Sequence, residues 1–217
     1  MTQTQTSFTD LFSRALQGSP VHIVGLEDDP KHLPVQDWTR DADEADLALL
    51  DLCPTCCIDI GCGPGRLTSA LAARGQIVLG IDIVSEAVGQ TRLRGAAALV
   101  RDVFKPMPGE GRWRTALLAD GNIGIGGDPV ALLARARELI SPEGRIVVEV
   151  KGSGVAMKTL WATLECGEAT SRPFRWAIVG LDDIDHVAAQ AGLVAASRHP
   201  IGDRWAVVLQ IPDVPFS

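Results

Sequence analysis

The sequence predicts an α/β protein with a doubly wound, mostly parallel sheet. Two features of the chain support this fold class. Apolar runs of five or six residues alternate five times with longer segments whose apolar residues recur at helical spacing. Polar groups, acids above all, follow the ends of these runs. Repeated strand–helix units place strands in parallel with helices on both faces, and 217 residues suffice for one such domain.

Three segments precede this alternation. A short amphipathic helix is expected within residues 1–18, because the apolar residues there share one helical face. Residues 19–40 contain three prolines and no clear periodicity. We expect this loop-rich segment either to cover the strand ends, as a lid or substrate wall, or to strap the flank of the core. Residues 41–53 predict another helix, with acids in its first turn.

The alternating segments define the central elements. Strands are expected at residues 56–60, 77–81, 96–100, 115–119 and 145–150. Helices are expected from about Arg66 to Gly75 and from Ser85 to near Gly95. A third helix begins at Asp128-Pro129, where an acid cap precedes a proline at the first helical position. Turns are expected at residues 106–111 and 142–144.

The pattern changes after residue 150. Residues 160–165 and 174–179 predict an inserted β-hairpin, which would bring Trp161, Arg175 or Trp176 near a substrate. A helix capped by Asp182 or Asp183 is then expected to end at Gly192. Residues 194–198 and 205–211 predict a closing antiparallel pair around Gly202-Asp203.

A glycine-rich stretch joins the first of these strands to its helix. Asp59 ends an apolar run, glycines recur at every second position up to Gly65, and the helix begins at Arg66. Glycines permit positive φ and the close approach of a ligand, and a helix N-terminus offers free N–H groups. Seventeen residues after Gly65, Asp82 ends the next strand, where a carboxylate can accept two hydrogen bonds from a ribose. The stretch therefore predicts a nucleotide site.

Two kinds of nucleotide site have such a loop. The dinucleotide fingerprint is G-x-G-x-x-G, whereas here the third glycine comes only two residues after the second, and bulky Arg66 follows it. The order Asp59, Gly61, Gly63, Gly65 and then Asp82 resembles instead motif I and the next acidic strand end of class I S-adenosylmethionine (SAM)-dependent methyltransferases. The resemblance spans roughly residues 51–211 and is most specific at the glycines and Asp82. It implies a Rossmann-like sheet with a reversed final strand.

The resemblance also implies a role for each residue of the loop and strand ends. Gly61, Gly63 and Gly65 would flank the methionine part of SAM, Asp82 would hold the ribose, and Asp102 would meet the adenine amino group. Asp59 is expected near the ammonium group, directly or through water. The cofactor site is completed by neighbouring residues, namely Cys62, Ile83, Val103 and Asp120.

Candidate catalytic residues follow the strand at 115–119, where the family places such groups. Asp120 is expected to act as a base or to orient the acceptor, and Asn122 to bind a polar group of the acceptor, with a bare turn as the alternative. His32, like His22 in the same segment, is a further candidate base. No metal is expected, because the pair Cys53 and Cys56 lacks the second pair of ligands that a zinc site needs.

The expected function is methyl transfer from SAM to an oxygen or nitrogen of a small molecule. A nicotinamide-dependent oxidoreductase and a non-catalytic SAM-binding protein remain the alternatives. A net charge of −7 argues against nucleic acid as a partner, and no apolar run spans a bilayer. Residues 1–6 lack signal-peptide features, so we expect a cytoplasmic protein. The expected oligomeric state is a monomer or a homodimer. One domain is expected over 1–217, with an N-terminal cap or lid segment at 1–52 and a SAM-binding core at 53–150. The substrate-side hairpin, the last helix and the closing strands are expected at 151–217.

Overall fold

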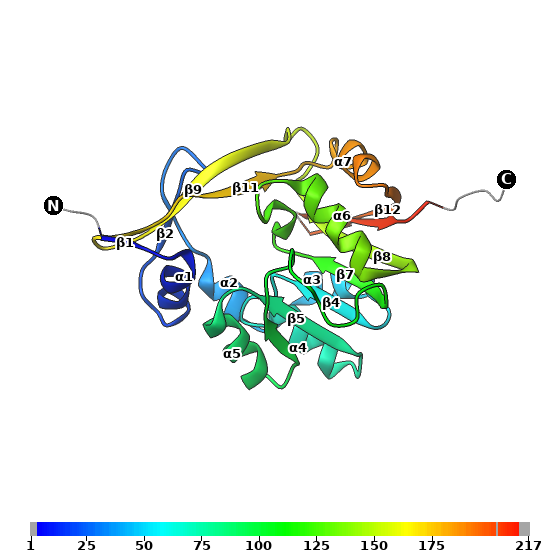
Figure 1. Cartoon of the computed structure of the whole chain (residues 1–217), viewed down its shortest axis with the longest axis horizontal. Helices are drawn as coiled ribbons and strands as arrows, with labels where there is room; N and C mark the ends of the chain where they lie inside the picture. The colour runs from blue at the N-terminus through cyan, green and yellow to red at the C-terminus, as the bar shows by residue number, and fades with distance from the viewer. Residues whose placement is uncertain (1–3, 203, 213–217) are drawn as a thin grey trace.

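The computed structural model describes residues 4–202 and 204–212 and contains two sheets (Figure 1). The main sheet has the strand order β12-β13-β8-β7-β4-β5-β6. Its strands are β4 (Cys57–Ile60), β5 (Val78–Asp82), β6 (Ala98–Val100), β7 (Trp113–Leu118), β8 (Ile140–Val150), β12 (Val194–Ile201) and β13 (Arg204–Gln210). Strands β4 to β8 pair in parallel, whereas β13 is antiparallel to both β8 and β12. This confirms the predicted α/β sheet with a reversed final strand, although Asp203 of the predicted last turn lies outside the described residues.

Helices cover both faces of the main sheet. On one face lie α6 (Pro129–Leu139) and α7 (Ile184–Gln190), and on the other lie α3 (Glu44–Leu50) and α4 (Arg66–Ala73). Successive side chains of a strand point to opposite faces. Along β8, Ile146 and Val148 accordingly join the core cluster of α6 and α7, while Val147 joins that of α3 and α4. Helix α5 (Ser85–Leu93) packs against β5 and β6.

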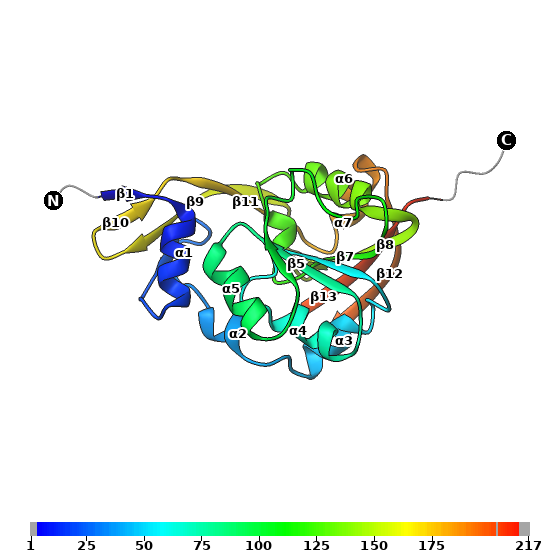
Figure 2. The same ribbon diagram turned by 60° about the horizontal axis from the view of Figure 1, so that its bottom comes forward.

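The second sheet joins strands near the N-terminus to the segment that follows β8. It has the order β1-β10-β9-β2-β3, with β11 also paired to β9. Its strands are β1 (Thr4–Thr6), β2 (His22–Val24), β3 (Lys31–His32), β9 (Lys158–Cys166), β10 (Ala169–Ser171) and β11 (Phe174–Ile178). Helix α1 (Phe8–Leu16) packs Leu11 and Ala15 against Leu164 of β9. In Figures 1 and 2, α1 and the β9–β10 region lie together at one end of the molecule. We call α1 to α2 (Val35–Thr39) together with β9 to β11 the cap.

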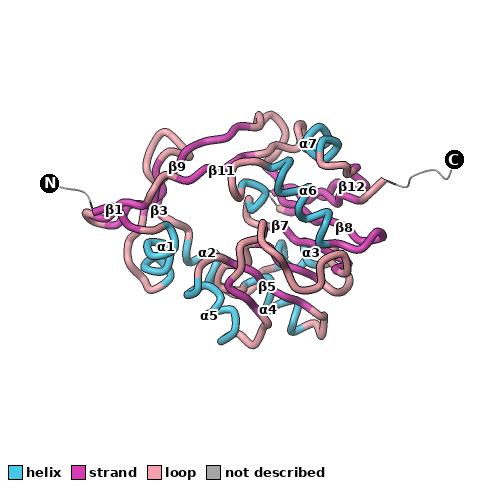
Figure 3. The backbone as a smooth tube through the Cα atoms, in the orientation of Figure 1, coloured by secondary structure: helices cyan, strands magenta, loops and turns pink. Residues whose placement is uncertain are grey.

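One prediction of local structure was incomplete and another was wrong. Residues 19–40 are rich in loops as expected, but they also contain β2 and β3, which enter the second sheet, and α2 (Figure 3). The turn at 142–144 is instead part of β8, which runs unbroken from Ile140. Between the pairs Trp113–Ile140 and Thr115–Arg145, two steps of β7 face five of β8, so these residues form a bulge. Gly144 permits it, because a Cβ there would lie 2.8 Å from Cβ of Ile140.

The inserted hairpin is present, and it is more elaborate than the sequence predicts. β9 and β11 pair antiparallel as expected, but β10 lies between them in the chain and pairs with the far end of β9. Trp161 and Arg175 are cross-strand partners on one face of this hairpin. Trp176 and Leu160 are partners on the other face. The two tryptophans that the sequence placed near a substrate therefore point to opposite sides.

Candidate active site

The glycine loop connects β4 to α4 and is packed tightly at two of its three glycines. Gly61, Gly63 and Gly65 all have positive φ, with values of 74°, 53° and 88°. A Cβ on Gly65 would lie 2.7 Å from Oγ1 of Thr91, and one on Gly61 would lie 2.7 Å from Nδ2 of Asn122. A Cβ on Gly63 would meet no atom within 4 Å. The loop is thus clamped at both ends and open at Gly63, where a ligand can approach the backbone.

Asp82 supports the loop from the end of β5. Its Oδ2 accepts a hydrogen bond from the backbone N–H of Gly63 at 3.0 Å, and its Oδ1 accepts one from Val84 at 2.8 Å. Burial raises the pKa of this carboxyl, and these N–H groups partly offset that rise. Each carboxylate oxygen keeps a further lone pair, so Asp82 can hold the loop and still accept hydrogen bonds from a ribose.

Asp59 is a buried carboxyl at the end of β4. It is 2% exposed and accepts a 2.6 Å hydrogen bond from Oγ1 of Thr68. Burial raises its pKa to about 7; the Thr68 hydrogen bond opposes this rise, and the charge of Asp120 adds to it. A cation close to Asp59 would relieve this unfavourable burial of charge, so its surroundings fit the ammonium group that the sequence assigned to it.

The remaining predicted cofactor residues lie along the same edge. Asp102 follows β6 and accepts a 2.9 Å hydrogen bond from the N–H of Phe104. Ile83 is 49% exposed, whereas Val103 and Cys62 are buried, and all three border the same cavity as Asp59 and Asp82. Burial, followed by the charges of Asp59 and Asp82, raises the pKa of the Cys62 thiol, which stays neutral. The edge therefore offers apolar side chains for a flat base and acids for polar groups.

Asp120 lies in the predicted place but is tied into an ion-pair network. It follows β7 with a φ of 52°, and both its carboxylate oxygens lie 2.6 Å from Nη2 of Arg66. Arg66 is 4% exposed and also pairs with the fully buried Asp46 of α3. Arg204 links Asp46 to Glu149, and its Nη1 lies 3.7 Å from Asp120. Because both oxygens of Asp120 are in contact with Arg66, the network favours a positioning role for Asp120.

Sequence reasoning missed most of this network. Arg66 was noted only as an obstacle to a dinucleotide, and Asp46 and Arg204 were assigned no role in the site. Glu149 was expected at the same edge of the sheet, but without a role. Although burial raises the pKa of Asp46, the hydrogen bond and charge of Arg66, with help from the backbone of Asp43 and from Arg40, lower it well below its usual range. One feature of the sequence could have indicated this network. Arg66 is the first residue of a helix that packs on the sheet, and a buried arginine requires an acidic partner.

The side-chain amide nitrogen of Asn122 is not free to bind a methyl acceptor. Both hydrogens of that group are used, because Nδ2 lies 2.9 Å from the carbonyl oxygens of Ile60 and of Gly61. Asn122 therefore fixes the glycine loop to the short 3-10 helix η1 (Asn122–Gly124). Its geometry indicates a role in shaping the cofactor loop, in place of the predicted contact with an acceptor.

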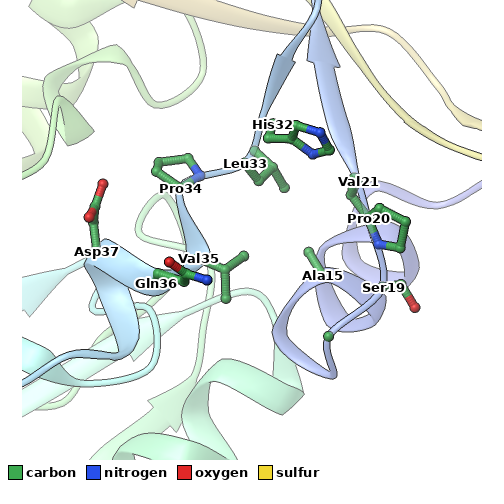
Figure 4. A pocket seen from close by; sticks show the side chains of 11 residues that line it. Ala15, Ser19, Pro20, Val21, His32, Leu33, Pro34, Val35, Gln36 and Asp37 are labelled. Carbon is green, nitrogen blue, oxygen red and sulfur yellow. The ribbon is translucent and has the colours of Figure 1, made fainter.

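His32 lies away from the other predicted site residues. It borders a smaller pocket of about 480 Å³ between α1 and α2, where its ring is at the far side from Asp37 (Figure 4). Its Nε2 lies 3.1 Å from Nε2 of His22 on the paired strand. The structure does not bring His32 together with Asp120, and we do not retain it as a candidate base.

One large cavity unites the glycine loop with the cap. Its volume is about 590 Å³, within the range of small-molecule sites. One side is formed by the loop and by the residues that follow β4, β5, β6 and β7. The other side is formed by α1, by residues 23–38 and by β9 and β11. The segment 19–40 thus forms a wall of the site, one of the two roles expected from the sequence.

Comparisons with known proteins agree with this geometry. Residues 57–144, from β4 into β8, match the family described as a methyltransferase domain. The probable cobalt-precorrin-6B C(15)-methyltransferase (decarboxylating) of Methanothermobacter thermautotrophicus is 27% identical over 148 residues, covering 66% of this chain and 74% of that protein.

Solved structures of methyltransferases share the fold. A SAM-dependent methyltransferase from Bacteroides fragilis, in complex with S-adenosyl-L-homocysteine (SAH), has a TM-score of 0.79 at 18% identity and covers 96% of this chain and 97% of its own. The 1,6-didemethyltoxoflavin-N1-methyltransferase of Burkholderia thailandensis has a TM-score of 0.58 at 18% identity, covering 82% and 81%. The domain matched over residues 57–144, the shared fold and the glycine loop together support a class I SAM-dependent methyltransferase.

Proposed function

We propose that this methyltransferase transfers the methyl group of SAM to an oxygen or nitrogen atom of a small molecule. The observation that carries the proposal is the cavity of about 590 Å³, which is bounded by the glycine loop on one side and by the cap on the other. A space walled on two sides suits a small molecule better than a macromolecular surface. Its volume leaves room for a small acceptor beside the reactive end of the cofactor.

The chain holds the cofactor through the edge of the main sheet. When bound, SAM supplies an electrophilic methyl group on a sulfonium. The open backbone at Gly63 accommodates the methionine part, Asp59 faces its ammonium group, and Asp82 accepts hydrogen bonds from the ribose. Ile83 and Val103 flank the adenine, and Asp102 meets its amino group. These assignments follow from the sequence and fit the burial and charge of each residue.

Positioning supplies most of the catalysis in this proposal. Methyl transfer is an in-line displacement that needs the two reacting atoms held about 3–3.5 Å apart. Both oxygens of Asp120 are engaged with Arg66, so in this proposal the acceptor arrives as a neutral amine or a readily ionised hydroxyl.

Carbon is the second candidate acceptor atom. It is favoured by the name of the 27% identical relative, a probable C(15)-methyltransferase that also decarboxylates. A carbon nucleophile usually needs a base or a leaving carboxylate to generate it, and the acids near the cavity are engaged with Arg66, Thr68 or backbone N–H groups. We therefore place oxygen and nitrogen first.

The test uses SAM labelled with ¹³C in its methyl group. The protein is incubated with mixtures of phenols, amines and electron-rich carbon acids, and the chemical shift of the transferred methyl identifies the acceptor atom. Signals from O–CH₃ or N–CH₃ products support the proposal, and signals from C–CH₃ products alone contradict it. Asp82→Ala should weaken SAM binding by about 1.5–3 kcal/mol and lower turnover accordingly, which ties any product to this site.

We further propose a cytoplasmic location and no nucleic-acid partner. All five cysteines are free thiols, four of them within ten residues, and this suits a reducing compartment. No helix among residues 4–202 and 204–212 is long and apolar enough to cross a membrane. Whether the protein is a monomer or a homodimer stays a prediction to be measured by light scattering.

A further inference from the structure

The cap side of the cavity is almost entirely apolar. Eleven residues line it from α1, from residues 23–38, and from β9 and β11, and Arg175 is the one charged residue among these eleven. Five of the eleven are aromatic, namely Phe8, Phe12, Trp38, Phe174 and Trp176. The acids that line the cavity all belong to the cofactor side. The acceptor therefore meets a surface built for an apolar body.

Four of these aromatic rings already have ring partners. Phe8 meets Phe174 edge-on with ring centroids 4.9 Å apart, and Phe12 stacks on Trp38 at 5.4 Å with ring planes 15° apart. Among the described residues, no aromatic ring pairs with Trp176, and no atom accepts a hydrogen bond from its indole N–H. Trp176 thus presents an unpaired, half-buried ring at the cavity.

Trp176 is held against the loop that follows β7. Its backbone pairs with Ile125 in an isolated bridge, and Gly124 lies directly against its ring. A Cβ on Gly124 would lie 2.5 Å from Nε1 of Trp176, so a side chain there would displace the indole. The absence of a side chain at Gly124 lets the indole lie close to η1.

The same short helix holds the glycine loop. Asn122 donates hydrogen bonds to Ile60 and Gly61, and two residues later Gly124 packs against Trp176. The cofactor loop and the indole are therefore fixed to each other through η1. A flat molecule on the indole would occupy a set position relative to the cofactor, as an in-line displacement demands.

We propose that the acceptor is a flat aromatic molecule whose ring stacks on Trp176, which makes Trp176 a specificity-determining residue. This inference rests on the proposed function, because it names the class of molecule that fills the acceptor half of the cavity. Aromatic stacking adds to the burial of apolar area, and it discriminates against a saturated molecule of the same size.

Trp161 provides a matched control on the same hairpin. It is 64% exposed, lies on the opposite face of β9 and β11 from Trp176, and does not itself line the cavity. Replacing either tryptophan removes one indole from this small sheet. Only the loss of Trp176 should affect a stacked acceptor.

The experiment compares 2-naphthol with trans-decahydro-2-naphthol, which carries a hydroxyl at the same position of a saturated bicycle. Each is titrated calorimetrically into the SAH-loaded wild type, Trp176→Leu, Trp176→Phe and Trp161→Leu, after SAH affinity is measured for each protein. We expect the wild type and Trp161→Leu to bind the naphthol about tenfold more tightly than the saturated alcohol. Trp176→Leu should lose this preference, and Trp176→Phe should keep part of it, with SAH affinity unchanged throughout.

The inference would be overturned if the wild type bound the naphthol and the saturated alcohol equally well, or if it bound neither of them. It would also be overturned if Trp176→Leu retained the full preference for the naphthol. Loss of the preference in Trp161→Leu would also contradict it, since that residue lies off the cavity. Failure of the wild type to bind SAH would count against the proposed cofactor site instead, and so the two proposals fail separately.

Discussion

Replacing Asp59 by asparagine should stabilise this protein at alkaline pH and weaken its cofactor site. Asp59 is 2% exposed, and its Oδ2 accepts a 2.6 Å hydrogen bond from Thr68. Burial raises its pKa from the ordinary 3.8 to about 7, and the charges of Asp120 and Asp82 contribute to the rise. Ionising Asp59 in the folded chain is therefore costly, and asparagine removes that cost while it can still accept the hydrogen bond from Thr68.

The direction of the pH dependence follows from proton binding. Between about pH 4 and pH 7, folded Asp59 holds a proton that the unfolded chain has released. The free energy of unfolding contributed by this group therefore falls as the pH rises through that window. At about 1.36 kcal/mol for each pKa unit, the full difference sets an upper limit of about 4 kcal/mol. Because the amide of asparagine must also be desolvated, we expect a gain of about 1–3 kcal/mol at pH 8.

Urea denaturation of the wild type and Asp59→Asn at pH 4.5 and pH 8 measures this gain. The two proteins should be similar in stability at pH 4.5, and the variant should be more stable at pH 8. Calorimetry at pH 8 should show SAM affinity lower by about tenfold or more, since the variant lacks a charge opposite the ammonium group. The reasoning is refuted if the variant is no more stable at pH 8, or if the stability difference does not change with pH.

Three further variants test other parts of the site. Gly65→Ala should lower the free energy of unfolding by about 2 kcal/mol more than Gly75→Ala and should abolish SAM binding. Both positions have positive φ, but only at Gly65 would a Cβ meet Thr91, at 2.7 Å. Equal losses of stability in urea denaturation would contradict the packing argument. Asp46→Asn should destabilise the folded protein by about 3 kcal/mol, because it removes the anion that pairs with buried Arg66. The control Asp51→Asn breaks an exposed pair with Arg74 and should cost less than about 1 kcal/mol of stability. Similar losses of stability in the two variants would argue against the network. Asn122→Ala should lower SAM affinity about tenfold, because the carbonyl oxygens of Ile60 and Gly61 lose the hydrogen bonds that hold the glycine loop. An unchanged SAM affinity with a raised KM for the acceptor would instead support a role of Asn122 in acceptor binding.

The parts of the fold that could be predicted are those with local causes. Asp128 accepts a hydrogen bond from the N–H of Ala131 and precedes a proline, so the start of α6 is fixed within four residues. Gly75 and Gly95 have the positive φ that helix ends require. The order of acids and glycines around Gly63 likewise fixes the cofactor loop, because its chemistry depends on spacing along the chain.

The second sheet could not be predicted, since its causes are not local. β1, β2 and β3 are two or three residues long and show no alternation of their own. They form because Thr4 pairs with Ala169 and His22 with Glu165, residues that are more than 140 positions apart. Such short strands gain their order from the hairpin that they join. The mistaken turn at 142–144 has a related origin, because pairing with β7 converts a proline–glycine signal into a bulge.

The ion-pair network escaped prediction for the same reason. Asp46 meets Arg204 across 158 positions of sequence, and Arg66 meets Asp120 across 54. No spacing rule links these residues; burial of charge at the edge of the sheet does. Asp120 lies at the strand end where the sequence placed it, whereas its pairing with Arg66 became visible only in three dimensions.

A crystal structure of the protein with bound SAH tests the account of the site most directly. We expect the ribose hydroxyls within hydrogen-bond distance of Asp82, the adenine between Ile83 and Val103, and the amino group of SAH on the side of Asp59. We also expect a free volume between the sulfur atom and Trp176. SAH bound elsewhere, or bound with its ribose away from Asp82, would contradict the assignment of this edge as the cofactor site.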